Sequence, residues 1–87
     1  MLKIKNLAPN QTELHLGDDL TVFFSYETPV AAWVSGKGYM RTEEKYSRTT
    51  SKHITNWLRR ATGQGNYPAL SVPQYQIDAL VNVVKVA

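Results

Sequence analysis

The sequence predicts an α+β fold in which a small antiparallel sheet of three to five N-terminal strands is followed by two helices packed on one of its faces. Apolar and polar residues alternate in short runs over the first three-fifths of the chain, which is the period of half-buried strands. Over the last two-fifths, apolar residues recur at helical spacing. Strands followed by helices are typical of the α+β class, and so small a sheet needs helices packed against it.

Three strands are predicted near the N-terminus. Residues 2–7 and 12–16 alternate between apolar and polar side chains, and a turn at residues 8–11 separates them. Residues 20–27, after a Gly-Asp-Asp turn, form the strongest predicted strand because they are rich in aromatic and β-branched side chains. These runs make up the first part of the predicted sheet.

Pro29 complicates the next segment, since proline cannot donate a ladder hydrogen bond and marks an edge, a bulge or a break. Residues 20–34 therefore form either one bent strand or two strands with a kink at Thr28 and Pro29. Residues 35–38, Ser-Gly-Lys-Gly, predict a hairpin turn because glycine adopts positive φ. Residues 39–44 are the expected second arm of this hairpin.

Two helices are predicted in the remainder of the chain. Hydroxyl groups at residues 49–51 can cap the first helix, and Gly63 suits its left-handed C-cap. Pro73 fits the first turn of the second helix, after a loop over residues 64–70. Because residues 81–86 are rich in β-branched side chains, a final strand is an open alternative for them. The apolar stripes are Ile54, Trp57, Leu58 and Ala61 in the first helix and Ile77, Leu80, Val81 and Val84 in the second.

The chain has 87 residues, a mass of 9.8 kDa and no cysteine, so we expect a single domain over residues 1–87. The lack of cysteine excludes disulfides, cysteine-based zinc sites and thiol nucleophiles. No apolar stretch approaches the length of a membrane-spanning helix, and the first residues lack the apolar core of a signal peptide. We therefore expect a cytoplasmic protein without a membrane partner.

The net charge of +3 is distributed unevenly along the chain. Residues 1–36 carry two cations and four carboxylates, for a net charge of −2, and residues 61–87 are neutral. Residues 37–60 carry seven cations and two carboxylates, for a net charge of +5. A local basic surface of this kind can attract phosphates or an acidic protein.

The sequence offers few side chains for catalysis. His15 is expected to face solvent from a strand, and His53 lies at the start of the first helix without a second histidine at helical spacing. Glu43 and Glu44 are neighbours on a predicted strand, so they point to opposite faces and cannot act as a pair. We therefore expect a protein that is not an enzyme and that binds no metal and no cofactor.

The face of the first helix opposite its apolar stripe carries three fixed positive charges, an amide and an imidazole. Such a face could lie on a phosphate backbone or meet an acidic protein surface. It could also be a solvated face whose last arginines complement the helix dipole. The side chains of this face are Lys52, His53, Asn56, Arg59 and Arg60.

The segment before this helix adds cations, an aromatic ring and hydroxyl groups. Lys45, Tyr46 and Arg48 lie in it, and Arg41 lies in the preceding hairpin arm. Aromatic rings among cations can stack on bases while the cations hold phosphates, although Tyr46 could instead cover the edge of the core. The candidate residues for binding nucleic acid or another partner are therefore Arg41, Lys45, Tyr46, Arg48, Lys52, His53, Asn56, Arg59 and Arg60.

Two segments resemble a family of small uncharacterised proteins from bacteriophages and mobile elements. Residues 23–30 contain its strand pattern Ser-Tyr-x-Thr-Pro-Val, and residues 45–58 contain Tyr-Ser-x-Thr-Thr-Ser-Lys-His-Ile-x-x-Trp-Leu at a helix start. The resemblance covers residues 20–60. Because the family is a domain of unknown function, it implies no catalytic residues. It implies a small phage-type accessory protein, located in the cytosol of the host cell if phage-encoded.

These observations lead to three expectations for function. The first is a non-enzymatic phage-type accessory protein that binds nucleic acid through a basic face on residues 41–60. The alternative is a protein-binding inhibitor of an acidic host protein that acts in defence or in nucleic-acid processing. The third is a structural homo-oligomer, such as a homodimer.

Overall fold

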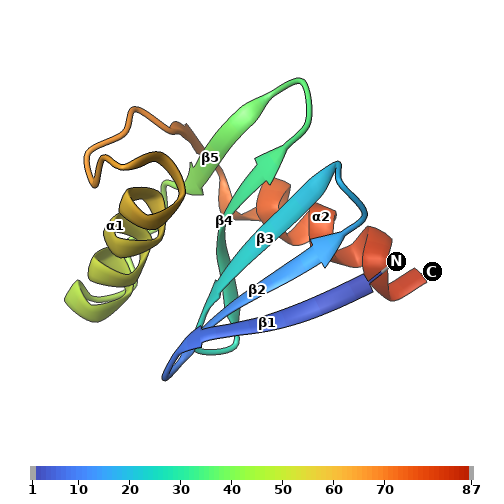
Figure 1. Cartoon of the computed structure of the whole chain (residues 1–87), viewed down its shortest axis with the longest axis horizontal. Helices are drawn as coiled ribbons and strands as arrows, with labels where there is room; N and C mark the ends of the chain where they lie inside the picture. Colours follow the sequence, from blue (N-terminus) through green and yellow to red (C-terminus); the bar gives the residue numbers. More distant parts are fainter. Residues whose placement is uncertain (1, 87) are drawn as a thin grey trace.

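The computed structural model describes residues 2–86, with side chains described as far as residue 82. In this part of the chain, six strands form one sheet and two helices pack against it (Figure 1). Neither helix of the described residues is long and apolar enough to span a membrane. The elements are β1 (Leu2–Ala8), β2 (Gln11–Leu16), β3 (Leu20–Ser25), β4 (Thr28–Val34), β5 (Gly38–Thr42), α1 (Arg48–Thr62), β6 (Leu70–Val72) and α2 (Gln74–Val86).

The six strands follow one another across the sheet in chain order. β1 to β5 are antiparallel neighbours, whereas β6 runs parallel to β5 and reaches it through α1. The α+β class is confirmed, but the sheet is mixed and larger than the predicted antiparallel sheet of three to five strands. The sequence gives no sign of β6, because a strand of three residues is too short to display a period.

Residues 20–34 form two strands rather than one bent strand. A two-residue turn, Tyr26 and Glu27, separates β3 from β4. Pro29 lies inside β4 opposite Phe24, where the register of the β3–β4 pair shifts. This irregularity accommodates the missing N–H of the proline, so the chain reverses before Pro29 and not at it.

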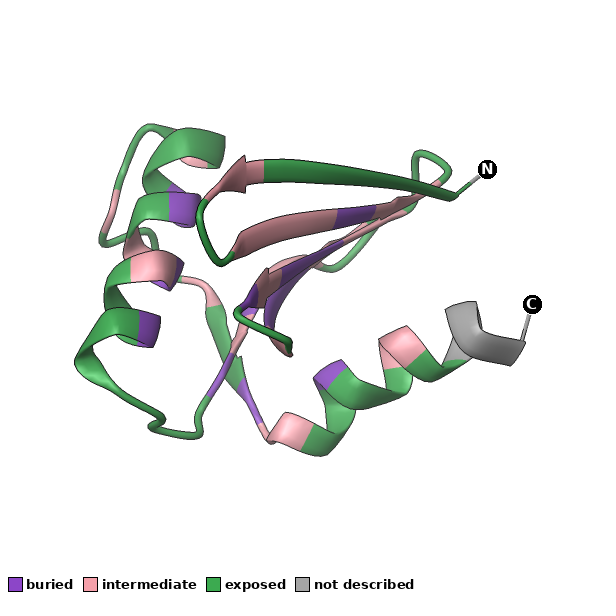
Figure 2. Ribbon diagram, turned by 90° about the horizontal axis from the view of Figure 1, so that it is seen from below, coloured by how far each residue is buried: buried purple, intermediate pink, exposed green. Residues whose placement is uncertain are grey.

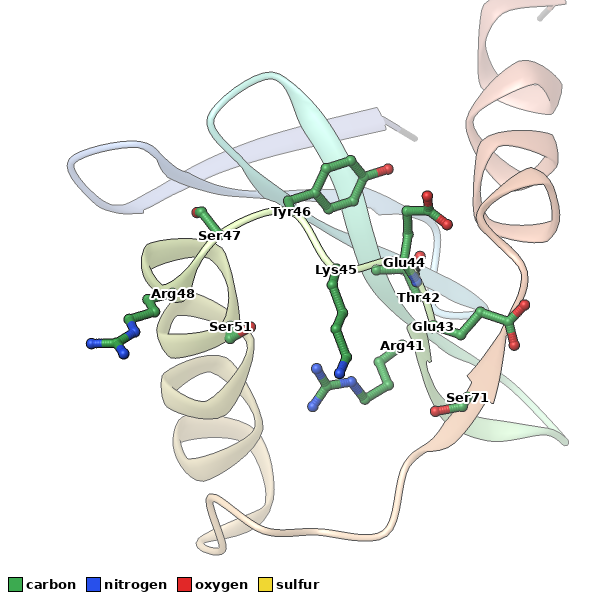
Figure 3. Close-up of a pocket in the computed structure, with 10 residues that line it drawn as sticks. All are labelled: Arg41, Thr42, Glu43, Glu44, Lys45, Tyr46, Ser47, Arg48, Ser51 and Ser71. Carbon is green, nitrogen blue, oxygen red and sulfur yellow. Dashed lines mark hydrogen bonds between the residues drawn. The ribbon is translucent and has the colours of Figure 1, made fainter.

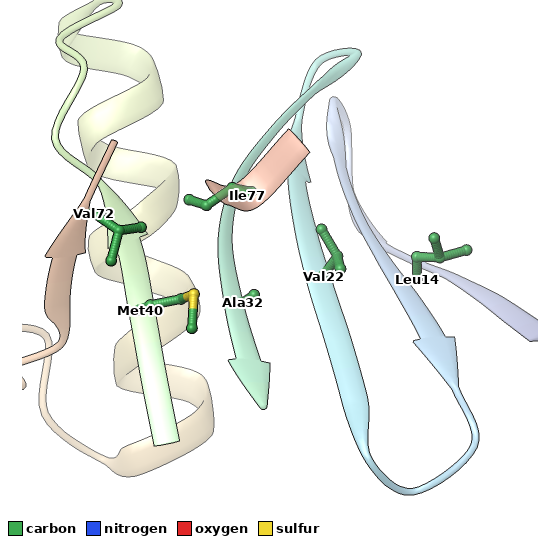
Figure 4. Packing of buried hydrophobic residues seen from close by; sticks show 6 residues of the cluster. All are labelled: Leu14, Val22, Ala32, Met40, Val72 and Ile77. Atoms are coloured by element: carbon green, nitrogen blue, oxygen red, sulfur yellow. The ribbon is translucent and has the colours of Figure 1, made fainter. Parts of the chain in front are cut away.

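The two helices cover opposite faces of the sheet, so the prediction that both pack on one face is wrong. Alternate residues of a strand point to opposite faces, and Val22 therefore belongs to the core under α2 while Phe23 belongs to the core under α1. The chain re-enters the sheet as β6 between the helices and then leaves on the other side. The α2 side packs Leu14, Val22, Ala32, Met40, Val72 and Ile77 (Figure 4), and the α1 side packs Phe23, Val30, Ala31, Ile54, Trp57 and Leu58.

Both ends of α1 are capped. The N-cap is Ser47, whose Oγ accepts a hydrogen bond from the Thr50 N–H at 3.1 Å, and not one of the predicted hydroxyls of residues 49–51. Gly63 ends the helix as predicted, with a φ of 85° and its N–H donating to the Arg59 carbonyl at 2.8 Å. Of the predicted apolar stripe, Ile54, Trp57 and Leu58 are buried and Ala61 is exposed.

α2 is helical through residue 86, so the alternative of a final strand over residues 81–86 is wrong. Its first residue, Gln74, donates from Nε2 to the Pro29 carbonyl at 2.7 Å, and Ile77 is fully buried against the sheet. This packing overrides the strand propensity of the following residues. The predicted stripe residue Val84 lies outside the described side chains. Figure 2 shows that the outer side of α1 and most of β1 are exposed.

Candidate functional site

A groove opens where the end of β5, the connector to α1, the first turns of α1 and β6 meet (Figure 3). Its volume is about 710 Å³. The parallel pairing of β5 with β6 places Ser71 beside Arg41, so residues far apart in the chain meet in this groove. Four of the predicted binding residues line it, Arg41, Lys45, Tyr46 and Arg48, together with the hydroxyl-bearing residues Ser47, Ser51 and Ser71.

Two cations lie at the centre of the groove. The side chains of Arg41 and Lys45 point into the same space between α1 and β6, whereas Glu43 and Glu44 point away from it (Figure 3). Among the described residues, neither cation forms an ion pair with a carboxylate. Because Glu43 and Glu44 also line the groove, its three cations and two carboxylates leave a net charge of +1, and no ion pair among these described side chains offsets Arg41 or Lys45.

The electrostatics of the groove favour an anion. Arg41 and Lys45 repel each other, because their side chains share a hollow and form no ion pair with Glu43 or Glu44. The first turn of α1 adds to the positive potential, because it exposes N–H groups at the positive end of the helix dipole and contains no acidic residue. An anion would be attracted by Arg41 and Lys45 and could accept hydrogen bonds from the hydroxyls of Ser51 and Ser71. The groove can thus hold a phosphate or a carboxylate group.

Tyr46 and Arg48 lie at the margin of the groove rather than with the two central cations. Arg48 extends from the first turn of α1 away from the centre (Figure 3). The Tyr46 ring is 46% exposed; partial burial raises the pKa of its phenol, and the carboxylates of Glu44 and Asp78 raise this pKa further. The phenol of Tyr46 is therefore neutral at pH 7 and lies near carboxylates.

The outer side of α1 carries an exposed stripe of Lys52, Asn56 and Arg60, which are spaced four residues apart. Arg59 lies on another side of the helix, against the loop that follows it. A Cβ atom added to Gly65 would lie 2.9 Å from Nη2 of Arg59, which places the guanidinium directly over this glycine. The three residues of the stripe are available to a partner, whereas Arg59 also packs on the loop.

His53 lies at the border of the outer face of α1, where the helical periodicity places it, but its imidazole turns toward the end of β3 instead of facing solvent. Its Nδ1 lies 2.7 Å from Ser25 Oγ, and the same hydroxyl donates to Thr50 Oγ1 at 3.3 Å. Ser25 is only 1% exposed, so its hydroxyl is closed to a substrate and the pair acts as a link between helix and sheet. Residue 53 borders the apolar stripe of the helix. The hydrogen bond with Ser25 on the sheet decides the direction in which the His53 side chain points.

The structure adds Tyr26 to the surface beside α1. Its ring is 51% exposed, and its centroid lies 5.7 Å from that of His53 with the planes tilted by 40°. In the sequence this residue looks like part of a strand, because its neighbours are aromatic and β-branched. The signal that could have revealed it is weak, since the turn of Tyr26 and Glu27 contains neither glycine nor asparagine.

A second polar cluster links α1 to β2. Glu13 accepts a hydrogen bond from Trp57 Nε1 at 2.6 Å, and its other carboxylate oxygen lies 2.9 Å from His15 Nε2. His15 Nδ1 in turn lies 3.2 Å from Thr21 Oγ1, so the predicted strand histidine belongs to a hydrogen-bonded chain. In the described part of the chain, no three His, Asp or Glu side chains form a group that could hold a metal ion.

A comparison with protein-family models finds a match over residues 2–71 to a family described as "Family of unknown function (DUF8033)". No curated protein and no solved structure matches the chain. The matched residues include the whole groove, all of α1 and Tyr26. The predicted membership of an uncharacterised family is confirmed, whereas the phage origin and the two motifs stay predictions.

Proposed function

This chain belongs to DUF8033, a family of unknown function, and we propose that it is a non-enzymatic protein that binds nucleic acid. The observation that carries the proposal is the pair of Arg41 and Lys45, which share a groove without a carboxylate partner among the described residues (Figure 3). A negatively charged polymer that carries a phosphate at every nucleotide supplies the missing charge at this point and along the neighbouring helix.

The proposed contacts are mainly with the phosphate backbone. In the groove, Arg41 and Lys45 hold one phosphate, and the hydroxyls of Ser51 and Ser71 donate hydrogen bonds to its oxygens. Along the outer side of α1, cations hold further phosphates and an amide can reach a sugar or a base. The residues proposed for this second surface are Lys52, Asn56 and Arg60, with Arg48 and Arg59 at its margins.

The test is the binding of a short labelled nucleic acid at increasing salt concentration. Affinity should fall steeply with salt, because phosphate contacts release counterions. The double variant Arg41→Ala/Lys45→Ala should reduce the slope of log affinity against log salt by about one, because the two cations together neutralise one phosphate. Affinity should fall alike for all nucleotide sequences, because phosphate contacts carry no sequence information.

The matched control is Lys3→Ala/Lys5→Ala, which removes the same charge from exposed side chains of β1, at the opposite edge of the sheet from the groove. This control should retain the wild-type salt slope. Equal losses in the two double variants would mean that net charge and not the groove drives binding. Absence of binding at low salt would reject the proposal.

The other two functions expected from the sequence are alternatives, of which the inhibitor would use the same basic surface and the homo-oligomer an outer face of the sheet. A host protein captured from lysate after nuclease treatment, and lost with Arg41→Ala/Lys45→Ala, would favour an inhibitor of an acidic protein. A mass well above 9.8 kDa in light scattering would favour a homo-oligomer. A phage-type accessory role is compatible with each outcome and is proposed on the sequence resemblance alone.

A further inference from the structure

Tyr26 occupies the first position of the turn between β3 and β4 with a φ of 58°, in the left-handed region of backbone conformation. Glycine adopts this region without steric cost, whereas a Cβ atom is crowded there. The turn is held in place by the Tyr26 N–H, which donates to the Asn10 carbonyl of the β1–β2 turn at 2.7 Å. The chain therefore carries a tyrosine at a position where glycine would be less strained.

The core does not account for this tyrosine. Its ring is 51% exposed, and its aromatic contact is with His53, whose imidazole is fixed by Ser25 Oγ at 2.7 Å. The ring thus rests against a held imidazole and leaves about half of its surface to solvent. Backbone strain that packing does not explain is concentrated at functional sites.

Tyr26 lies beside the charged outer side of α1. His53, Asn56 and Arg60 are separated by three and four residues, so they follow one another along the same side of the helix. Asn56 and Arg60 are exposed, and Lys52 is exposed next to His53. Tyr26 also borders an open hollow of about 590 Å³ lined by polar residues of the first and third hairpins. Through its contact with His53, the half-exposed Tyr26 thus adjoins the side of α1 that carries Asn56 and Arg60, while Glu27 lines the hollow on its other side.

We propose that Tyr26 stacks on an unpaired base of single-stranded DNA or RNA whose phosphates contact Lys52 and Arg60. This inference rests on the proposed function, because the same helix face holds the phosphates. Stacking tolerates every base, since each base has a π face, and it requires a base that is not already paired and stacked in a duplex. The site therefore selects single strands over duplexes and is indifferent to sequence, with Asn56 positioned to bond to a base edge.

The test compares oligodeoxythymidine, oligouridine and a DNA duplex of equal length by fluorescence anisotropy. Wild-type protein should bind the two single strands more tightly than the duplex, and their relative affinities distinguish DNA from RNA as the preferred strand. Tyr26→Ala should weaken single-strand binding by about 5- to 150-fold, which corresponds to the loss of one stacked base. Its duplex affinity and its salt slope should be unchanged, because no charge is removed.

Two further variants separate the ring from the fold. Tyr26→Phe keeps an aromatic ring and should bind single strands as the wild type does. Tyr26→Gly should melt at a higher temperature than Tyr26→Ala, since both lack the ring and only glycine relaxes the positive φ. Both should nevertheless lose the same single-strand affinity.

A change of charge beside Tyr26 gives an independent test. Glu27→Gln should strengthen binding, because it removes a negative charge beside the proposed base site.

The outcomes distinguish this inference from the proposed function. If wild-type protein binds nucleic acid and Tyr26→Ala binds single strands equally well, the inference is wrong while the proposed function stands. A preference for single strands that survives in Tyr26→Ala also overturns it, because another residue then supplies the stacking. If wild-type protein binds neither single strands nor duplex at low salt, both proposals are wrong.

Discussion

The two faces of the sheet are covered in different ways. On the α2 side, the buried cluster consists of aliphatic side chains and Met40, and a polar link to the sheet lies at the first residue of the helix, where Gln74 donates to the Pro29 carbonyl. On the α1 side, the buried cluster is accompanied by two polar links, one between Ser25 and His53 and one between Glu13 and Trp57. Apolar burial is non-directional, whereas a hydrogen bond requires a defined distance and angle. Two directional bonds one turn apart therefore hold α1 in a defined rotation, whereas α2 has such a bond only at its first residue among the described side chains.

This rotation matters because α1 carries the proposed binding surface. His53, at the border of the outer side of the helix, and Trp57, on its buried side four residues later, both bond to the sheet. Their bonds set the direction in which Lys52 and Asn56 project from the outer side. Among the described side chains of α2, none belongs to the candidate site. Changes on the α2 side should therefore affect stability alone, and changes on the α1 side should affect stability and binding together.

The largest effect on stability is expected when a buried side chain is truncated in either core. Leu58→Ala and Ile77→Ala should each lower the free energy of unfolding by about 2–5 kcal/mol, because both side chains are fully buried and a cavity remains. Urea denaturation measures this loss. Compared at equal folded fraction, only Leu58→Ala should also weaken nucleic-acid binding. Equal binding by both folded variants would contradict the distinction between the two faces.

The next effect tests the polar link of Glu13. Glu13→Ala should lower the free energy of unfolding by about 1–3 kcal/mol, because the indole N–H of Trp57 loses its acceptor at 2.6 Å. Glu13→Gln keeps an acceptor oxygen and should lose less, which makes it the matched control. Urea denaturation of both variants decides the matter. Wild-type stability in Glu13→Ala would show that water replaces the carboxylate and that the link does not hold α1.

A smaller effect is expected at the start of α1. Ser47→Ala should lower the free energy of unfolding by about 1 kcal/mol, because the N-cap acceptor of the Thr50 N–H is lost. Ser51→Ala, at an exposed position one turn later, should leave stability unchanged although it removes a proposed phosphate contact. Hydrogen exchange of the first helical turn should speed up in Ser47→Ala alone. The same rate in both variants would argue against the cap.

The smallest effect depends on pH and belongs to the α1 side. Burial raises the pKa of Tyr39 above its ordinary value of 10.0, and Tyr67 and Glu13 raise it further. The raised pKa favours the neutral phenol in the folded state, so its stabilisation is present below pH 10.0 and is lost as the pH rises through the folded pKa. Melting temperatures should therefore fall less steeply above pH 10.0 in Tyr39→Phe than in the wild type.

The control for this prediction is Tyr75→Phe, at a position of α2 that is 69% exposed. It should leave the alkaline fall in melting temperature unchanged. Tyr46, whose pKa burial also raises, should account for part of the fall that remains in Tyr39→Phe. Identical alkaline curves for Tyr39→Phe and the wild type would show that the buried phenol does not couple to folding.

The long elements of this fold could be predicted from the sequence. The short strand β6 and the placement of the helices relative to the sheet could not. β1, β2 and both helices show their period over six or more residues, so alternation and apolar stripes indicate them. β6 has three residues and no period, and its pairing with β5 depends on contacts between distant segments. Because the chain changes face at β6, the opposite placement of the helices could not be predicted without it.

The charge of the candidate site could be predicted, but its geometry could not. The excess of cations over residues 37–60 indicates a basic surface. The β5–β6 pair decides that Ser71 lies beside Arg41, and Arg59 packs against Gly65 although its charge equals that of its neighbours. His53 follows the helical wheel in position but bonds to Ser25 instead of facing solvent. Local patterns carry no information on such contacts.

The path of the chain from β5 through α1 to β6 also has a consequence for the order of folding. β1 to β5 pair with their neighbours in the chain, so their hairpins close short loops and form early. β6 pairs with β5 only after residues 43–69 have been enclosed, which is a slower closure. Because Ser71 completes the groove beside Arg41, the proposed phosphate site is assembled in this late step. A phosphate bound by Arg41 on β5 and Ser71 on β6 would link the two strands that enclose residues 43–69. Nucleic acid should therefore slow the detachment of β6 from β5 more than the opening of any hairpin.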